Sequence, residues 1–255
     1  MTGRDFHDAA TEIDGMIDNL EPAETVEPDN TELNDEMRNA LWLAAKPIVE
    51  SDLVSKYLAN RGLCDWQPGK DFRTIDRRVT FKGDLIGTPG LLALVYDSDG
   101  KPVTLHQTPI SGGKRYKDRI LSRGDYPAGS AIRIDAAAET MGIAEGIENA
   151  KSASKIIGLP VWALLNANNL RSFQPPAICK KLVIFADYDA SFTGQEAGYF
   201  LANKLVKQKI ECEVSFAQYG RTGFDWNNRL LAWQNQMQAP NSLIDINGSN
   251  AGGKI

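Results

Sequence analysis

The stretch Lys181-Leu-Val-Ile-Phe-Ala-Asp-Tyr-Asp-Ala190 decides how the rest of this 255-residue chain is interpreted. Its apolar run over 181–186 predicts a strand buried on both faces, as strands of a parallel sheet are. Two carboxylates, Asp187 and Asp189, follow directly, where the chain must turn. Ligands bind at the carboxyl ends of such strands, and two close carboxylates are tolerated mainly when a cation lies between them. The alternative is that Asp187 or Asp189 only caps the next helix, and this stretch alone does not decide between the two.

Short apolar runs alternate with helical patterns from residue 140 onward. We expect strands at 140–144, 160–165, 181–186 and 211–217, helices at 147–157 and 194–208, and a last helix from Asp225 toward Trp233. The buried face of the helix at 194–208 is expected to hold Ala197, Phe200, Leu201 and Leu205. Strands joined by helices require right-handed crossovers, so the sheet should be mostly parallel. The polar segment from Gln234 onward is expected to be a frayed tail or a linker.

Carboxylates follow the carboxyl ends of several of these expected strands. They are Glu145, Asp187, Asp189 and Asp225. Because the carboxyl ends of parallel strands meet at one edge of a sheet, we expect these side chains to converge. A helix cap accounts for any one of them but not for the shared edge. Glu148, one turn further along the helix, is expected to be solvated or to interact with the helix dipole.

The residues before 140 predict a smaller region of mixed helix and strand. One helix is expected at 34–45, and a second begins after Ser51 or Asp52 and ends at Gly62. Residues 90–96 and 101–108 predict a hairpin around an Asp-Gly turn. A basic segment follows, and it contains Lys114, Arg115, Lys117, Arg119 and Arg123. Such a segment is either a solvated loop or a surface for a phosphate backbone.

The net charge of −5 is unevenly distributed. Residues 1–36 contain twelve acidic residues and one basic residue, a net charge of −11, which leaves +6 for the rest. This acidic arm has few large apolar residues and is expected to be disordered, while a basic body is compatible with an anionic partner. The three cysteines show neither disulfide nor zinc-ribbon spacing, and no apolar run approaches the roughly 20 residues that a membrane span needs. A reducing cytoplasm is therefore the expected setting.

Two short motifs resemble the marks of the Toprim domain, which bacterial-type primases, topoisomerases and certain nucleases share. The first is Glu145-Gly146 at the end of one expected strand, and the second is Asp187-Tyr-Asp189 two strands later. A further acidic residue of the family follows the fourth strand, where Asp225 is a less specific match. The resemblance covers residues 140–232.

The upstream sequence resembles bacterial-type primases in particular. Lys56-Tyr-Leu-Ala-Asn-Arg-Gly-Leu63 is similar to the Tyr-Leu-x-x-Arg-Gly-Leu helix that opens their catalytic core. The expected hairpin and basic segment follow in the same order as in that core. The Asn-rich and Asp-Trp-Asn sequences of this chain resemble those that recur in primase-like Toprim proteins of phages, plasmids and other mobile elements.

The resemblance implies an α/β fold, with a Toprim domain built on a mostly parallel sheet after a smaller mixed α+β subdomain. The implied division is an acidic arm (1–36), an N-terminal primase-core subdomain (37–136), a Toprim domain (137–235) and a polar tail (236–255). The implied function is that of a DNA primase, a nucleotidyltransferase that makes short RNA primers on single-stranded DNA with Mg²⁺ or Mn²⁺. Ribonucleoside triphosphates and template are the implied partners, with a helicase or another replication protein as a further candidate.

The resemblance also assigns roles to residues. Glu145, Asp187 and Asp189 would be catalytic, and the same three with Asp225 would hold the metal. The basic residues that would face template and nucleotide are Lys114, Arg115, Lys117, Arg119 and Arg123.

Departures from the family keep other functions open. Replicative primases have a glycine soon after Asp-x-Asp, whereas Ser191-Phe-Thr-Gly194 makes that loop longer here. The sequence shows neither the primase zinc module nor a Walker loop, so template choice and unwinding would come from other proteins or from parts of a longer polypeptide. The alternatives are a Toprim nuclease, a non-enzymatic replication or defence factor, and a receiver-type phosphoacceptor domain. A receiver-type domain is expected to carry its cluster of acidic residues after the first strand, where this sequence has a glutamate instead.

Overall fold

The computed structural model describes residues 35–115, 126–218 and 221–238. The acidic arm up to residue 34 and the tail from residue 239 lie outside the described residues, as do Lys117, Arg119 and Arg123. Each helix that the structure describes is too short or too polar to span a bilayer.

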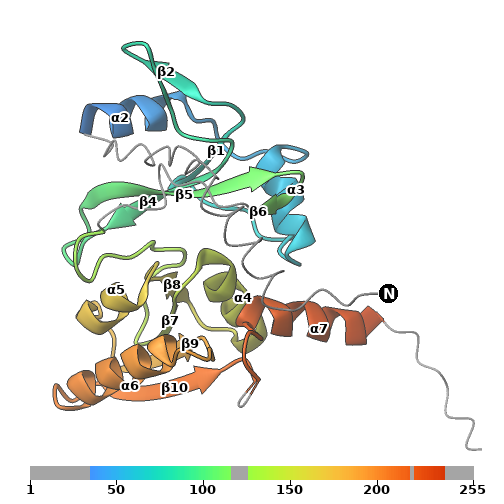
Figure 1. Cartoon of the computed structure of the whole chain (residues 1–255). Helices are drawn as coiled ribbons and strands as arrows, with labels where there is room; N and C mark the ends of the chain where they lie inside the picture. The colour runs from blue at the N-terminus through green and yellow to red at the C-terminus, as the bar shows by residue number, and fades with distance from the viewer. Residues whose placement is uncertain (1–34, 116–125, 219–220, 239–255) are drawn as a thin grey trace, which may run out of the picture. The chain divides into compact units, whose positions relative to one another are not determined.

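The C-terminal half is built on a four-stranded parallel sheet (Figure 1). Its strands are β7 (Thr140–Ala144), β8 (Val161–Ala163), β9 (Lys181–Ala186) and β10 (Glu211–Phe216). The spatial order is β10-β9-β7-β8, and every neighbouring pair is parallel. The prediction of an α/β fold with a mostly parallel sheet is therefore confirmed.

Helices cover both faces of this sheet. They are α4 (Ile147–Ile157), α5 (Ala167–Ser172), α6 (Thr193–Val206) and α7 (Trp226–Gln238). Alternate residues of β9 point to opposite faces, as the two-residue repeat of a strand requires. Phe185 packs with Trp226 in the core that α4 and α7 cover, whereas Ile184 packs with Leu201 in the core under α5 and α6.

The N-terminal half contains a second, antiparallel sheet in the order β1-β4-β5-β6. Its strands are β1 (Phe72–Ile75), β4 (Gly90–Tyr96), β5 (Pro102–Ser111) and β6 (Lys114–Arg115), and β2 (Val79–Phe81) pairs separately with β3 (Asp84–Ile86). The pairing of β4 with β5 confirms the predicted hairpin. Two helices complete this half, α2 (Asp35–Ala44) and α3 (Leu53–Asn60). Asp52 caps α3, because its Oδ1 accepts from the Ser55 backbone N–H at 2.7 Å.

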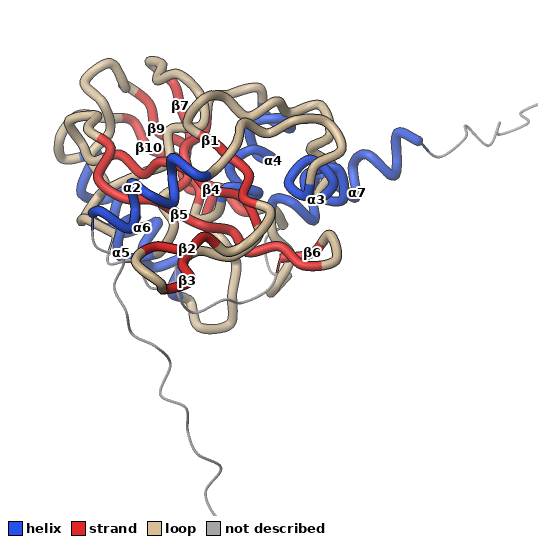
Figure 2. Tube along the Cα trace, turned by 90° about the horizontal axis from the view of Figure 1, so that it is seen from above, coloured by secondary structure: helices blue, strands red, loops and turns tan. Residues whose placement is uncertain are grey.

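The two halves share a hydrophobic core. Tyr57 and Leu63, at α3 and just beyond it, are buried in the same cluster as Phe185 and Trp226 of the C-terminal half. Residues 131 and 132 also join the sheets, since Ala131 pairs with Tyr96 of β4 and Ile132 pairs with Ala163 of β8. Both views place α3 beside α4 and α7 (Figures 1 and 2). The end of α3 is therefore brought to the parallel sheet.

Three local predictions were wrong. Phe200 is 52% exposed, because only the stripe of α6 through Ala197, Leu201 and Leu205 packs on the sheet. The second strand of the parallel sheet is shorter than expected and ends at Ala163. The last helix continues to Gln238, past the point where a frayed tail was expected.

Candidate active site at the strand ends

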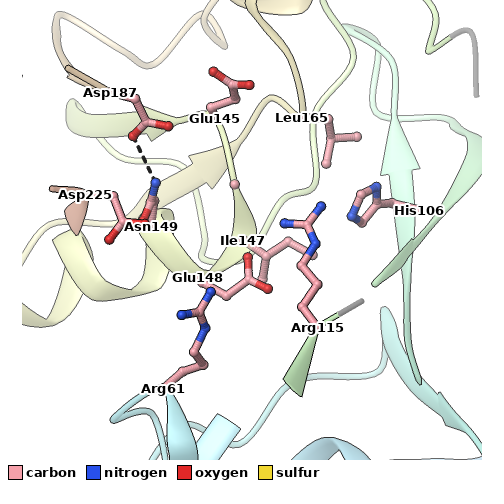
Figure 3. Close-up of a pocket in the computed structure, with 11 residues that line it drawn as sticks. Arg61, His106, Arg115, Glu145, Ile147, Glu148, Asn149, Leu165, Asp187 and Asp225 are labelled. Carbon is pink, nitrogen blue, oxygen red and sulfur yellow. Dashed lines mark hydrogen bonds between the residues drawn. The ribbon is translucent and has the colours of Figure 1, made fainter. Parts of the chain in front are cut away.

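A cavity of about 220 Å³ opens at the carboxyl ends of β7 and β9. One side carries the carboxylates of Glu145, Asp187 and Asp225. The other side carries Arg61 and Arg115 from the N-terminal half (Figure 3). The structure thus brings together three of the four predicted metal ligands and, of the two predicted basic residues that it describes, Arg115.

Asp187 follows β9 directly and is half-buried at the cavity. Its Oδ1 accepts a hydrogen bond from Asn149 Nδ2 at 2.9 Å. Burial, followed by the negative charges of Glu145, Asp225 and Asp189, raises the pKa of Asp187 to about 7. The carboxylates are therefore close enough to disfavour one another's charge, which a bound cation would relieve.

Glu145 follows β7 and enters the same cavity. Burial, and then the charge of Asp189, raises the pKa of its carboxyl above the usual range. Its backbone carbonyl accepts from the Leu165 N–H at 2.7 Å. Leu165 also lines the cavity and has a φ of +71°, a left-handed conformation that a leucine seldom adopts. Such backbone strain is common at binding and catalytic sites.

Asp189 does not line the cavity. Its two carboxylate oxygens accept from Ser191 Oγ at 2.5 Å and from the Gly194 N–H at 3.4 Å. The bond from Ser191 is the main reason why its pKa is lowered. A side chain at Gly194 would place its Cβ 2.9 Å from the Asp187 carbonyl oxygen, so this close approach requires glycine. Asp189 thus acts in part as a helix cap, as the alternative interpretation predicted, because its carboxylate accepts from a backbone N–H in the first turn of α6.

Asp225 is both a helix cap and a member of the acidic cluster, the two roles that the sequence left open. It caps α7, because its Oδ1 accepts from the Asn228 N–H at 2.7 Å while Asn228 Oδ1 accepts from the Asp225 N–H at 3.1 Å. It also lines the cavity, and its charge contributes to the raised pKa of Asp187. The cap therefore fixes the position of a carboxylate that faces the other acids.

Two buried asparagines connect these elements, although neither was predicted as a site residue. The Asn227 N–H donates to Asn149 Oδ1 at 3.2 Å, so the Asn149 amide presents its NH₂ group to Asp187. Asn227 Nδ2 donates to the Arg61 carbonyl at 2.7 Å and to Ser152 Oγ at 3.0 Å. In the local sequence, the only feature that could have indicated a role for Asn149 is its position as a polar residue in the first turn of the helix that follows Glu145.

The basic side of the cavity differs from the predicted basic segment. Arg115 of β6 lines the cavity, whereas Lys114 is exposed and does not. Arg61 and His106, which were not predicted as site residues, line it as well. Arg61 belongs to the motif at 56–63, so that motif was the available signal.

His106 is uncharged at neutral pH. Burial lowers its pKa to about 4, and its Nδ1 lies 2.7 Å from the hydroxyl oxygen of Tyr126. It therefore adds a polar but neutral group to the cavity wall.

Glu148 contradicts the expectation of a solvated residue. It is only 5% exposed, lines the cavity, and accepts from the hydroxyl of Tyr57 at 2.5 Å. The burial accompanies the contact between Tyr57 of α3 and Glu148 of α4, which local sequence does not show.

The side chains present fit a hard divalent cation. Within the described residues, no three His, Cys, Asp or Glu side chains are grouped closely enough to hold an ion by themselves. Mg²⁺ characteristically takes one or two carboxylates and completes its shell with water and substrate oxygens. The oxygen donors of Glu145, Asp187 and Asp225, with their mutually unfavourable charges, match that requirement.

The parallel sheet, with acidic residues after β7 and β9, defines the class of domain. Residues 140–234 match the family model Toprim_3, a Toprim domain, and residues 33–133 match DUF7146, a domain of unknown function. Residues 140–234 of this chain are therefore a Toprim domain. No curated protein sequence matches it.

The structure is similar to solved primase structures. The DnaG catalytic core matches with a TM-score of 0.50 and 10% identity, over 79% of this chain and 78% of that one. The primase fragment of the bacteriophage T7 primase-helicase protein matches at 0.41 and 13%, over 87% and 82%. A Pseudomonas aeruginosa DNA primase domain matches at 0.40 and 10%, over 61% of this chain and only 51% of that one. The match to the DnaG catalytic core shows that the fold is primase-like, as the sequence predicted.

Proposed function

We propose that this protein is a primase-like enzyme that joins ribonucleotides on single-stranded DNA with the help of a divalent cation. One observation carries the proposal: Glu145, Asp187 and Asp225 line the same cavity as Arg61 and Arg115. Nucleotide transfer needs charge neutralisation at a triphosphate and cationic groups for the phosphates of nucleotide and template. The cavity offers both within one volume.

The proposed roles follow from position. Asp187 and Asp225 would hold Mg²⁺ or Mn²⁺, which supplies neutralisation of the triphosphate charge when bound. Glu145, with its raised pKa, would hold a second ion or accept the proton of the attacking 3′-hydroxyl. Asp189 would support the site through the charge it exerts on Glu145 and Asp187, because its own oxygens bind Ser191 and Gly194.

The basic residues would bind phosphates. Arg61 and Arg115 reach the cavity and would contact the nucleotide or the nearest template phosphate. Lys114, exposed on β6, would contact the template further out, together with Lys117, Arg119 and Arg123 of the same basic segment. In this proposal residues 37–136 supply the basic side and residues 137–235 the acidic side of one catalytic core.

The test is a nucleotide-incorporation assay with labelled ribonucleotides on varied single-stranded templates, with and without Mg²⁺ or Mn²⁺. We expect short RNA products that need metal and template and that disappear with Asp187→Asn. A DNA-cleavage assay on the same samples identifies a nuclease that uses the same carboxylates. Cleavage without incorporation would refute the proposal, and so would neither activity, which would indicate a non-enzymatic factor.

A further inference from the structure

Glu148 is a buried charge that the proposed chemistry leaves unused. Among the described residues it is the one buried carboxylate, with 5% of its surface exposed. A buried carboxylate is costly unless it is hydrogen-bonded and paired. Its partner is the hydroxyl of Tyr57, which lies 91 residues earlier in the sequence and on a different helix. The contact joins α4 of the Toprim domain to α3 of the N-terminal half.

Tyr57 and Glu148 are both next to Arg61. The Arg61 guanidinium carbon lies 5.8 Å from the centre of the Tyr57 ring. Arg61 and Glu148 both line the cavity, and their side chains lie close together there (Figure 3). Arg61 Nε has no hydrogen-bond partner. The backbone at the end of α3 is held separately, because Asn227 Nδ2 and Gln234 Nε2 of α7 donate to the carbonyls of Arg61 and Gly62 at 2.7 and 2.9 Å. These backbone bonds leave the side chain of Arg61 with Tyr57 and the carboxylate of Glu148 as neighbours, and both favour its charged form.

We propose that Glu148 is a positioning residue that, together with Tyr57, holds the Arg61 guanidinium in the cavity to bind the phosphates of a nucleoside triphosphate. This inference rests on the proposed function for the class of ligand. The competing interpretation is that Glu148 only adds negative charge to the cavity and repels an anion. The two interpretations predict opposite effects when the charge of Glu148 is removed.

The experiment measures equilibrium binding of a fluorescent ribonucleoside triphosphate with Mg²⁺ to the full chain, without turnover. Glu148→Gln keeps the size of the side chain and an acceptor for Tyr57. We expect the affinity for the nucleotide to fall about tenfold, because Arg61 loses the charged neighbour that holds it in place. The fall is expected even though the cavity loses a negative charge. Tyr57→Phe should weaken binding in the same direction by about threefold, with no change in charge. Unchanged or tighter binding by Glu148→Gln would overturn the proposal.

Two further variants separate positioning from stability. Asp135→Asn breaks the 2.9 Å ion pair with Lys151 on the same helix α4, outside the cavity, and should leave the affinity unchanged. In an Arg61→Ala background, Glu148→Gln should cause no further loss. Loss of affinity with Asp135→Asn, or additive losses in the double variant, would show that Glu148 acts through general stability. A wild-type protein that binds the nucleotide but makes no primer would refute the proposed function while leaving this inference intact.

Discussion

The acidic and basic sides of the cavity are built in different ways. Glu145 and Asp187 follow adjacent parallel strands, so the pairing of β7 with β9 brings them together. Arg61, His106 and Arg115 instead come from the end of α3, from β5 and from β6. Their place at the cavity depends on the packing of the N-terminal half against the Toprim domain. Sheet topology therefore fixes the acidic side, whereas contacts between the two halves fix the basic side.

The largest expected effect comes from the acidic side. Asp187→Asn keeps the volume and the neighbour Asn149 but removes the charge that would bind metal. Nucleotide incorporation should fall about 100-fold or more, while the circular dichroism spectrum stays unchanged. Asp189→Asn is the matched comparison. Because Asp189 lies outside the cavity, this substitution should reduce nucleotide incorporation less than Asp187→Asn does. Equal losses in the two variants would contradict the distinction between these aspartates.

The same pair of substitutions should have opposite effects on stability. Because the pKa of Asp187 is raised in the folded state, the metal-free protein loses stability as the pH rises from the unfolded pKa near 4 to about 7. The full cost is present above pH 7, and there is no cost below pH 4. Asp187→Asn should therefore increase the free energy of unfolding at pH 8 by on the order of 2 kcal/mol, and by less as the pH falls toward 4. Asp189→Asn should lower stability at pH 8, because hydrogen bonds there favour the charged form. Urea unfolding at pH 8, 6 and 4 measures both.

Metal affinity should depend on pH through Asp187. A cation must displace the proton that this carboxyl holds below pH 7, so affinity rises with pH. With a pKa of about 7, Mn²⁺ should bind about tenfold more weakly at pH 6 than at pH 8. Electron paramagnetic resonance of free Mn²⁺ provides the measurement. Affinity that does not change between these pH values would exclude Asp187 as a ligand, and Asp187→Asn should abolish the dependence.

The smallest expected effects lie on the basic side. Arg115→Ala and Lys114→Ala should each reduce the log–log salt slope of single-stranded DNA binding by about 0.7, if each residue contacts one phosphate. Only Arg115→Ala should also weaken nucleotide binding, because Arg115 lines the cavity and Lys114 does not. Fluorescence anisotropy at several salt concentrations tests the first effect. An unchanged slope in both variants would identify a solvated loop.

Local sequence patterns are sufficient to predict the parallel sheet and the acidic residues that follow its strands. The observed bounds of β7, α4 and β9 are the predicted ones, because buried strands and helices leave periodic apolar patterns and glycine marks the helix end. A residue that follows a strand end can be placed at the sheet edge from chain order alone. Chain order therefore predicts that Glu145 and Asp187 share one site.

Which of these side chains enter the cavity, and which groups face them, depends on tertiary contacts. Asp189 turns to Ser191 and Gly194, although its spacing from Asp187 predicted a shared role. Glu148 is buried because Tyr57, 91 residues earlier in the chain, supplies a hydrogen bond. Local spacing records the element on which a residue lies, but burial and hydrogen-bond partners depend on contacts between residues that are far apart in sequence.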